Sequence, residues 1–172
     1  MILDPKERLN RGFIIAIASD HAGYGLKQQL IQRLQTVGVH GHTILDLGPE
    51  NEDRVDYPDY ATKVAAAVMG KHAERGMLIC GSGIGMSMMA NRYQGIRCAL
   101  VSEPESATLS RQHNDSNVLA LGARLIGVDM AWACVQAWLQ TPFSQGRHTA
   151  RVAKMEPGLW PPSIVFPKGD SQ

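Results

Sequence analysis

Residues 76–85 read Gly76-Met77-Leu78-Ile79-Cys80-Gly81-Ser82-Gly83-Ile84-Gly85. The apolar run up to Cys80 predicts a buried strand, and the glycines behind it predict a tight turn. Residues 86–92 can then form a helix, whose first turn would point backbone N–H groups and a partial positive charge back at the turn. A thiol in that place is biased toward the thiolate, and hence toward a nucleophile or base. The alternative is a small buried residue that packs under the turn.

The composition is that of one domain, without the marks of a nucleic-acid or membrane protein. The 172 residues are 44% hydrophobic, which is enough for a single core. The formal net charge is +1 and no basic block occurs, so nucleic acid and membranes are not expected partners. The three cysteines are widely spaced, which is typical of a reducing, cytoplasmic protein. No apolar run has the length of a signal peptide or a membrane span, so secretion is not expected.

Short β-rich runs alternate with helical patterns along the chain. The expected strands are 13–18, 43–47, 77–80, 97–101 and 117–120, and the expected helices are 26–37, 60–69, 85–92, 105–112 and 128–139. This alternation predicts an α/β fold, namely a doubly wound, Rossmann-like parallel five-stranded sheet flanked by helices. We expect an N-terminal extension over residues 1–12, one domain over 13–156 and a Pro-rich tail over 157–172. A C-terminal helix and this tail are expected to extend to a partner subunit.

Ligands of such sheets bind beyond the carboxyl ends of the strands, so the polar residues that follow each strand are candidates for a site. Together these residues supply a thiol, two histidines, a carboxylate, a hydroxyl and several loop amides. They lie in the segments Ser19-Asp20-His21-Ala22-Gly23, Arg54 to Tyr57, Cys80-Gly81-Ser82-Gly83, Ser102-Glu103-Pro104 and Arg111-Gln112-His113-Asn114-Asp115.

Two arginines near the end of the chain stand at helical spacing. Arg147 and Arg151 lie in the run Gly146-Arg147-His148-Thr149-Ala150-Arg151, four residues apart, and so share one face of a helix. Two guanidinium groups on one side form a plausible fork for a phosphate. The alternative is a solvated helix with one basic side.

Five blocks of sequence, in this order, resemble the family of ribose-5-phosphate isomerase B, which also holds the galactose-6-phosphate isomerase subunits. The resemblance covers residues 13–155. Its motifs are Ser19-Asp20-His21-Ala22-Gly23, Asp56-Tyr57-Pro58-Asp59-Tyr60, Cys80-Gly81-Ser82-Gly83-Ile84-Gly85, Ser110-Arg111-Gln112-His113-Asn114-Asp115 and Gly146-Arg147-His148. The sequence departs from the common pattern at Ser82, where threonine is frequent, and in the extra residues at both ends.

The resemblance implies an aldose–ketose isomerase without cofactor or metal that acts on a phosphorylated sugar, with ribose 5-phosphate as the leading substrate. It implies a homodimer or a dimer of dimers whose active sites lie across the subunit interface. By resemblance, Cys80 moves a proton between C2 and C1 through an enediolate, Ser82 stabilises the oxyanion, His113 helps to open the ring and Asp20 lies near the ring oxygens. The residues implied in substrate binding are His21, Tyr57, Gly81, Gly83, Gly85, Asn114, Arg124, Arg147, His148 and Arg151.

The glycine turn, the thiol and the histidines also invite other interpretations. The spacing of Gly81, Gly83 and Gly85 lacks the third glycine position of a dinucleotide-binding loop, and a cysteine phosphatase would need an arginine where Met86 stands. His40 and His42 could share one side of a strand, but no third metal ligand is close in sequence.

The open alternatives for function are an isomerase of a tetrose 4-phosphate, an allose 6-phosphate or a galactose 6-phosphate, and a noncatalytic partner subunit that binds sugar phosphates. Without the family, Asp20 and His21 serve equally well as caps of the helix that follows. Arg124 could pair with an acid on the surface, so its place in the site rests on the resemblance.

Overall fold

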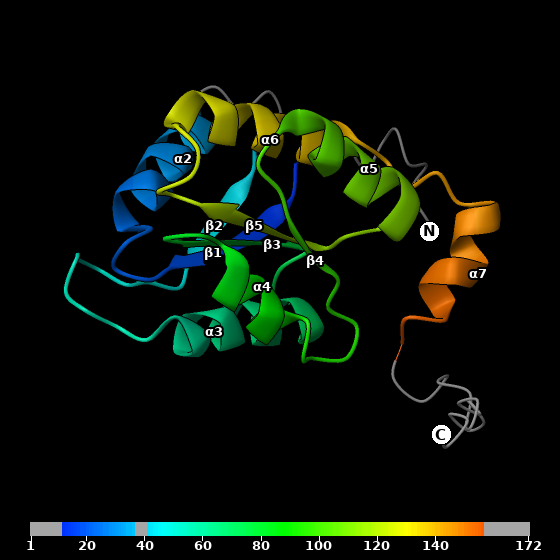
Figure 1. Ribbon diagram of the computed structural model, residues 1–172, viewed down its shortest axis with the longest axis horizontal. Coiled ribbons are helices and arrows are strands. Elements are labelled where there is room, and N and C mark those ends of the chain that lie inside the picture. Colours follow the sequence, from blue (N-terminus) through cyan, green and yellow to red (C-terminus); the bar gives the residue numbers. More distant parts are fainter. Residues whose placement is uncertain (1–11, 37–40, 157–172) are drawn as a thin grey trace, which may run out of the picture.

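The computed structural model describes residues 12–36 and 41–156. The chain alternates strand and helix as expected (Figure 1). The strands are β1 (Ile14–Ser19), β2 (Thr43–Asp46), β3 (Arg75–Cys80), β4 (Cys98–Leu100) and β5 (Val118–Gly122). The helices are α2 (Tyr24–Thr36), α3 (Tyr57–Met69), α4 (Ile84–Ala90), α5 (Pro104–Asn114), α6 (Val128–Gln140) and α7 (Arg147–Ala153). Residues 1–11 of the expected extension (1–12) and the expected tail at 157–172 lie outside the described residues.

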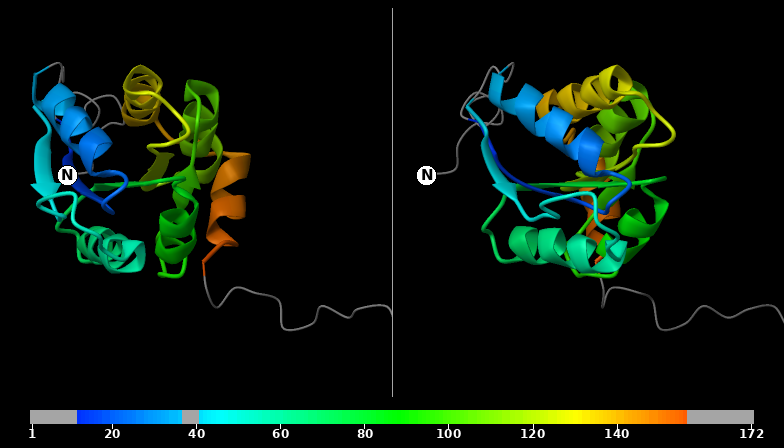
Figure 2. Two further views of the ribbon diagram at one scale, coloured as in Figure 1. Left: turned by 60° about the vertical axis from the view of Figure 1, so that its left-hand side comes forward. Right: turned by 90° about the vertical axis from the view of Figure 1, so that its left-hand side faces the viewer.

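The five strands form one parallel sheet in the order β2-β1-β3-β5-β4. The chain moves outward from β1 to β2, returns through α3 to place β3 on the other side of β1, and later places β5 between β3 and β4. Helices α2, α5 and α6 cover one face of the sheet, and α3 and α4 cover the other (Figures 1 and 2). The predicted doubly wound α/β fold is therefore confirmed.

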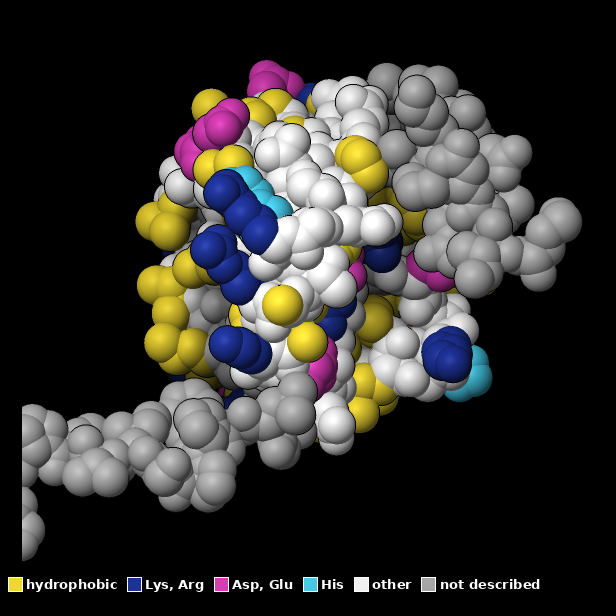
Figure 3. Space-filling model, turned by 90° about the vertical axis from the view of Figure 1, so that its right-hand side faces the viewer, with side chains coloured by type: hydrophobic (Ala, Val, Ile, Leu, Met, Phe, Trp, Pro, Cys, Tyr) yellow, Lys and Arg dark blue, Asp and Glu magenta, His cyan; other side chains and the backbone are white. Residues whose placement is uncertain are grey.

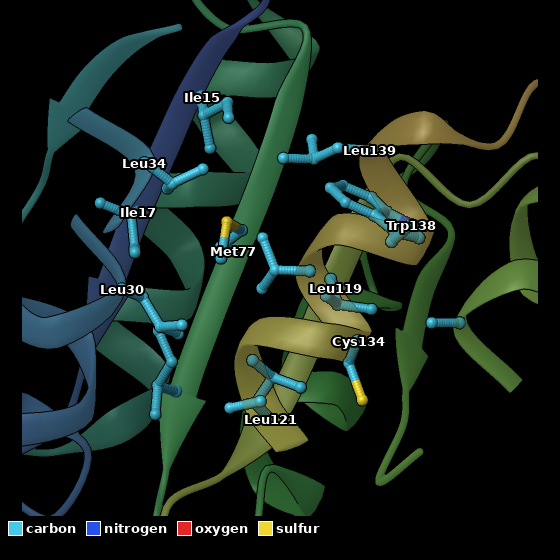
Figure 4. Close-up of a cluster of buried hydrophobic side chains, with 14 of the residues drawn as sticks. Ile15, Ile17, Leu30, Leu34, Met77, Leu119, Leu121, Cys134, Trp138 and Leu139 are labelled. Carbon is cyan, nitrogen blue, oxygen red and sulfur yellow. The ribbon is translucent and has the colours of Figure 1, made fainter. Parts of the chain in front are cut away.

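Alternation along the strands builds a core on each face of the sheet. Ile15 and Ile17 of β1 point toward α2 and α6, where they pack with Leu30, Met77 and Trp138 (Figure 4). The intervening residues of β1 and β3, including Cys80, pack in a second cluster with α3 and α4. Both cores are needed because a parallel sheet buries both of its faces.

Helix α3 begins at Tyr57, three residues earlier than the expected helix at 60–69. The sequence signal for the earlier start is Pro58, because proline is favoured in the first turn of a helix, where its missing N–H costs no hydrogen bond. The start matters for function since it places Tyr57 at the mouth of the pocket described below.

Helix α7 stands across the edge of the sheet, beside α5 and apart from the two helical layers (Figures 1 and 2). Its existence confirms that Arg147 and Arg151 share one helix, as their spacing predicts. The expected contact of this helix and the tail with a partner subunit is not seen in a single chain and stays a prediction.

Candidate active site

The turns that follow β1, β3 and β5 meet in one place. The N–H of Asp20 donates to the carbonyl oxygen of Ile79 (3.1 Å), which joins the end of β1 to the end of β3. The N–H of Ala123 donates to the carbonyl oxygen of Cys80 (2.8 Å), and that of Arg124 to the carbonyl oxygen of Gly81 (3.0 Å). Segments far apart in the sequence therefore share the carboxyl edge of the sheet, where open α/β folds bind ligands.

An open pocket of about 320 Å³ lies at this edge. Its lining contains seven residues that the sequence singled out, together with one that it did not. The lining residues are Asp20, Tyr57, Cys80, Gly81, Ser82, Gly85, Arg124 and Leu125. The structure thus brings seven of the expected site residues, Cys80 among them, to one pocket, and their roles in catalysis and binding stay predictions.

The thiol of Cys80 is 5% exposed and accepts a hydrogen bond from the N–H of Gly83 (Sγ···N 3.0 Å). Gly83 makes this bond as the N-cap residue directly before α4, with φ of 75°, a conformation that favours glycine. A Cβ atom on Gly83 would also lie 2.9 Å from the backbone of Leu121. Gly83 thus shapes the turn around the sulfur and does not itself line the pocket.

Asp20 has a structural and a pocket-facing role at once. Its Oδ1 accepts the N–H of Gly23 (2.9 Å), which closes the turn before α2. This bond lies in the turn before the helix and does not reach an N–H of α2, and the residue also lines the pocket beside Cys80. Such a turn fixes the carboxylate before any ligand arrives.

His21 and Arg124 differ in how the protein holds them. His21 Nδ1 lies 3.3 Å from the carbonyl oxygen of Val55 and 3.4 Å from its backbone nitrogen, so the loop before α3 holds the ring. The side chain of Arg124 is exposed, and its guanidinium passes over Gly81, where a Cβ atom would lie 3.5 Å from it. It forms no ion pair within the described segments, so the surface-pairing interpretation has no support there.

The remaining predicted residues form a second group on α5 and α7. The rings of His113 and His148 stack with centroids 4.4 Å apart and planes 8° from parallel. Arg147 Nε lies 3.5 Å from Nε2 of His148, and Arg151 follows one turn later on α7. Burial, followed by the charges of His113, Arg147 and Arg151, holds the pKa of His148 below its usual value.

None of this second group lines the pocket that contains Cys80. Asn114 lines a different cavity, of about 430 Å³, at the far side of β4. Figure 3 shows Lys and Arg side chains gathered on the side of the molecule that carries α7, with His side chains beside the uppermost of them. Within one chain, the predicted site residues therefore fall into two separate groups.

An apolar surface lies beside the Cys80 pocket, and sequence reasoning missed it. Leu125 is 66% exposed and Ile84 is 45% exposed, and both line a second hollow together with Leu100 (43% exposed). Met88, one turn after Ile84 on α4, is 65% exposed. No pattern in the sequence signals this surface, because an isolated apolar residue after a strand does not reveal whether its side chain is exposed. Such clustered exposure marks an interaction surface.

The described residues give no sign of a metal centre or a membrane span. No group of three or more His, Cys, Asp or Glu residues within them could hold a metal ion. His42 accepts the N–H of Phe13 at Nδ1 (3.0 Å) and stacks on the Phe13 ring, which is a structural role. His40 lies outside the described residues. No helix in segments 12–36 and 41–156 has the length and apolar character to cross a bilayer.

Residues 15–155 match the ribose/galactose isomerase family. The chain belongs to this family. The ribose-5-phosphate isomerase B of Escherichia coli is 47% identical over 138 residues, which is 80% of this chain and 91% of that protein. The Listeria innocua protein named ribose-5-P isomerase B is 42% identical over 142 residues, 83% of this chain and 94% of that one. The expected family is thereby confirmed, and the chain is an aldose–ketose isomerase.

Solved structures agree with this assignment over the same part of the chain. A ribose 5-phosphate isomerase of Thermotoga maritima superimposes with a TM-score of 0.80 at 46% identity, covering 84% of this chain and 97% of that one. The ribose-5-phosphate isomerase B of Clostridium thermocellum gives a TM-score of 0.79 at 44% identity, covering 82% and 93%. The shared fold places the same strand ends beside one another.

Proposed function

We propose that the protein interconverts ribose 5-phosphate and ribulose 5-phosphate, with Cys80 as the base. The observation that carries the proposal is the position of Cys80 Sγ, 3.0 Å from the N–H of Gly83 in a pocket shared with Asp20, Ser82 and Arg124. The names of the relatives support ribose 5-phosphate as the substrate, and the residues of the pocket support a thiol as the base. We expect the reaction to need no cofactor or metal.

The proposed chemistry is a proton transfer through an enediolate. Cys80 takes the proton from C2 of the open-chain aldose, the electrons of the C2–H bond form the C1=C2 double bond, and the carbonyl electrons move to O1. A proton then passes from O2 to O1, O2 becomes the ketone oxygen, and the electrons of the double bond take the proton back from Cys80 at C1. The N–H of Gly83 would stabilise negative charge on sulfur, and Ser82 would donate to the oxygen that gains charge. Arg124 would hold an anionic group at the open side of the pocket.

We further propose that the complete site needs two copies of the chain. His113, which would open the sugar ring, lies on α5 outside the Cys80 pocket, together with the cations of α7. The apolar surface formed by Ile84, Met88, Leu100 and Leu125 beside the pocket supports an interface there. A two-fold pairing would bring the His113 group of one copy to the Cys80 pocket of the other. A cytoplasmic location and the role of the tail stay predictions.

The first test is isomerase activity on four-, five- and six-carbon sugar phosphates without added metal or cofactor. We expect efficient turnover of ribose 5-phosphate, complete loss in Cys80→Ala and retained activity in Cys98→Ala, which alters a thiol outside the pocket. Preference for another sugar would keep the mechanism and change the substrate. Substantial activity of Cys80→Ala would refute the thiol base, and no turnover at all would favour a noncatalytic subunit.

Alkylation by iodoacetamide tests the thiol independently. Burial raises the pKa of Cys98 to about 12, and burial together with the nearby Glu103 raises that of Cys134 to about 11, so both remain thiols at neutral pH. We expect inactivation to follow alkylation of Cys80, and ribose 5-phosphate to protect against it. Inactivation with the label only on Cys98 or Cys134 would contradict the assignment.

Subunit mixing tests the shared site. Cys80→Ala and His113→Ala are each expected to be inactive alone. In a mixed dimer, one site would carry both changes and the other neither, so an equal mixture that has exchanged subunits would recover about a quarter of the wild-type specific activity. No recovery despite proven subunit exchange would show that each chain builds its own site.

A further inference from the structure

The side chain of Arg97, just before β4, connects three separate segments of the chain. Its Nε donates to the carbonyl oxygens of Asn114 (3.2 Å) and Asp115 (3.0 Å). One terminal nitrogen donates to Oδ2 of Asp115 (3.0 Å), and the other to Oε1 of Glu156 (3.0 Å). The side chain is 18% exposed, so water competes little for these bonds. All three of its nitrogens are used within the protein.

Asp115 links Arg97 to the end of α5. It ends the helix in a left-handed conformation, with φ of 47°, and its two carboxylate oxygens bind different arginines. Oδ1 accepts from Arg111 (2.8 Å), and Oδ2 accepts from Arg97. The helical turn that carries His113 and Asn114 is therefore fixed by ionic bonds on both sides.

Glu156 links Arg97 to the segment that follows α7. Its Oε1 accepts from Arg97, and its Oε2 accepts the N–H of Gly95 (3.1 Å). At the beginning of α7, the ring of His148 stacks on that of His113. Helix α7 is thus attached to α5 at both ends, directly through the rings and indirectly through Arg97.

The helix α7 that is attached in this way carries two arginines without acidic partners in the described segments. In segments 12–36 and 41–156, neither Arg147 nor Arg151 forms an ion pair with a carboxylate, and Lys154 follows directly after the helix. Like charges on and just after a helix of seven residues repel one another, so the arrangement of these cations depends on what anchors the helix. The carboxylate of Glu156, which binds Arg97, supplies a negative charge that anchors the end of this segment.

We propose that Arg97 is a positioning residue, which fixes α7 against the end of α5 and so keeps His113, Arg147 and Arg151 in one arrangement for a sugar phosphate. A planar guanidinium suits this role because its fork reaches four acceptor atoms on three residues, whereas a lysine ammonium cannot hold them in one plane. That the arrangement serves a sugar phosphate rests on the proposed function, whereas the fixing of α7 by Arg97 does not.

The kinetic test compares Arg97→Gln, Arg97→Lys and Glu156→Gln with Arg92→Gln. Arg92 is exposed in the same α4–β4 loop, and its loss removes an equal charge outside the network. We expect the three network variants to raise KM on the order of tenfold with a smaller change in kcat, as misplaced binding groups do. Arg92→Gln should leave KM unchanged. Glu156→Gln keeps an acceptor for Gly95, so it remains informative if Arg97→Gln does not fold.

The second readout is the titration of His148 by NMR, which needs no turnover. The pKa of this ring is lowered by its burial and by the charges of His113 on α5 and of Arg147 and Arg151 on α7. Loosening α7 exposes the ring, so we expect its pKa to rise toward the ordinary value in Glu156→Gln and not in Arg92→Gln.

The two readouts separate the proposals. A raised His148 pKa with no isomerase activity in the wild-type protein would sustain the positioning role and reject the proposed function. Unchanged KM and unchanged His148 titration in folded Arg97→Gln and Glu156→Gln would overturn the positioning role, whatever happens to thermal stability.

Discussion

Alanine at position 23 would test how tightly the turn after β1 is packed on β3. A Cβ atom there would lie 2.3 Å from the carbonyl oxygen of Ile79 and 2.6 Å from its carbonyl carbon. Ordinary contacts begin near 3.4 Å, so the turn and the strand would have to separate by about 1 Å. Backbone cannot rotate away as a side chain can. The same carbonyl accepts the N–H of Asp20, so the separation would also strain the pocket.

The cost follows from this overlap. Overpacking costs 1–3 kcal/mol in general, and a contact with backbone belongs at the upper end, so we expect Gly23→Ala to lose about 3 kcal/mol. For a chain of this length each kcal/mol lowers Tm by about 2–4 °C, which gives a drop of about 6–12 °C. Gly25→Ala is the matched control, because the atom nearest to a Cβ atom there, Glu52 Oε1, would be 3.9 Å away and alanine favours the helix by up to about 1 kcal/mol.

Thermal unfolding followed by circular dichroism, at one protein concentration, measures the difference. We expect Gly25→Ala to melt at or slightly above the wild-type temperature and Gly23→Ala to melt well below it. Residual folded Gly23→Ala should also turn over more slowly at 25 °C, since Asp20 is displaced from Cys80. Equal Tm values for the two variants would refute the close approach of the turn to β3.

Three further changes give distinct outcomes. Gly85→Ala would place a Cβ atom 2.7 Å from the ring of Tyr57, which is 41% exposed and can rotate away. KM should therefore rise while Tm stays within a few degrees, and an unchanged KM would argue against a role of Tyr57 in binding. Lys27→Met removes a fully buried ammonium 2.7 Å from Asp46 and should lower the free energy of unfolding in urea by about 2 kcal/mol, whereas an unchanged midpoint would contradict the importance of this pair. Because the pKa of His148 is lowered in the folded protein, the unfolded chain binds a proton at this ring more readily. Tm should therefore fall as pH drops from 7.5 through about 6.5 to 5.5, and it should fall less in His148→Gln. Equal dependence of Tm on pH in the two proteins would contradict the lowered pKa.

The strand–helix alternation was enough to predict the layers, because buried parallel strands and amphipathic helices leave clear patterns. The same logic placed Asp20 and Cys80 at one edge of the sheet, since the carboxyl ends of parallel strands meet there. The strand order was not predictable from these patterns, because pairing depends on packing between segments that are distant in sequence. Arg97 shows this limit, since its acceptors at the end of α5 and at Glu156 lie in segments that only the fold brings together.

Within the site, the glycine turn and the arginine pair left local signals, and the structure agrees with both. The separation of the site residues into two groups left no such signal. His113 and His148 stand thirty-five positions apart, and their stacking depends on how α7 crosses the edge of the sheet. Leu125 is a similar case, because a single leucine after a strand does not reveal that its side chain will stay exposed.

The adjacency of β1 and β3 sets a condition on when the pocket comes into being. Asp20 and Cys80 are sixty positions apart, and α2, β2 and α3 lie between them in the chain. Closing a loop of that length costs entropy before any contact repays it. A growing chain therefore cannot assemble the pocket before β3 has been made and has found β1, and Arg124 joins only after β5. Recovered activity during refolding would thus report the completion of the central sheet rather than the first collapse of the chain.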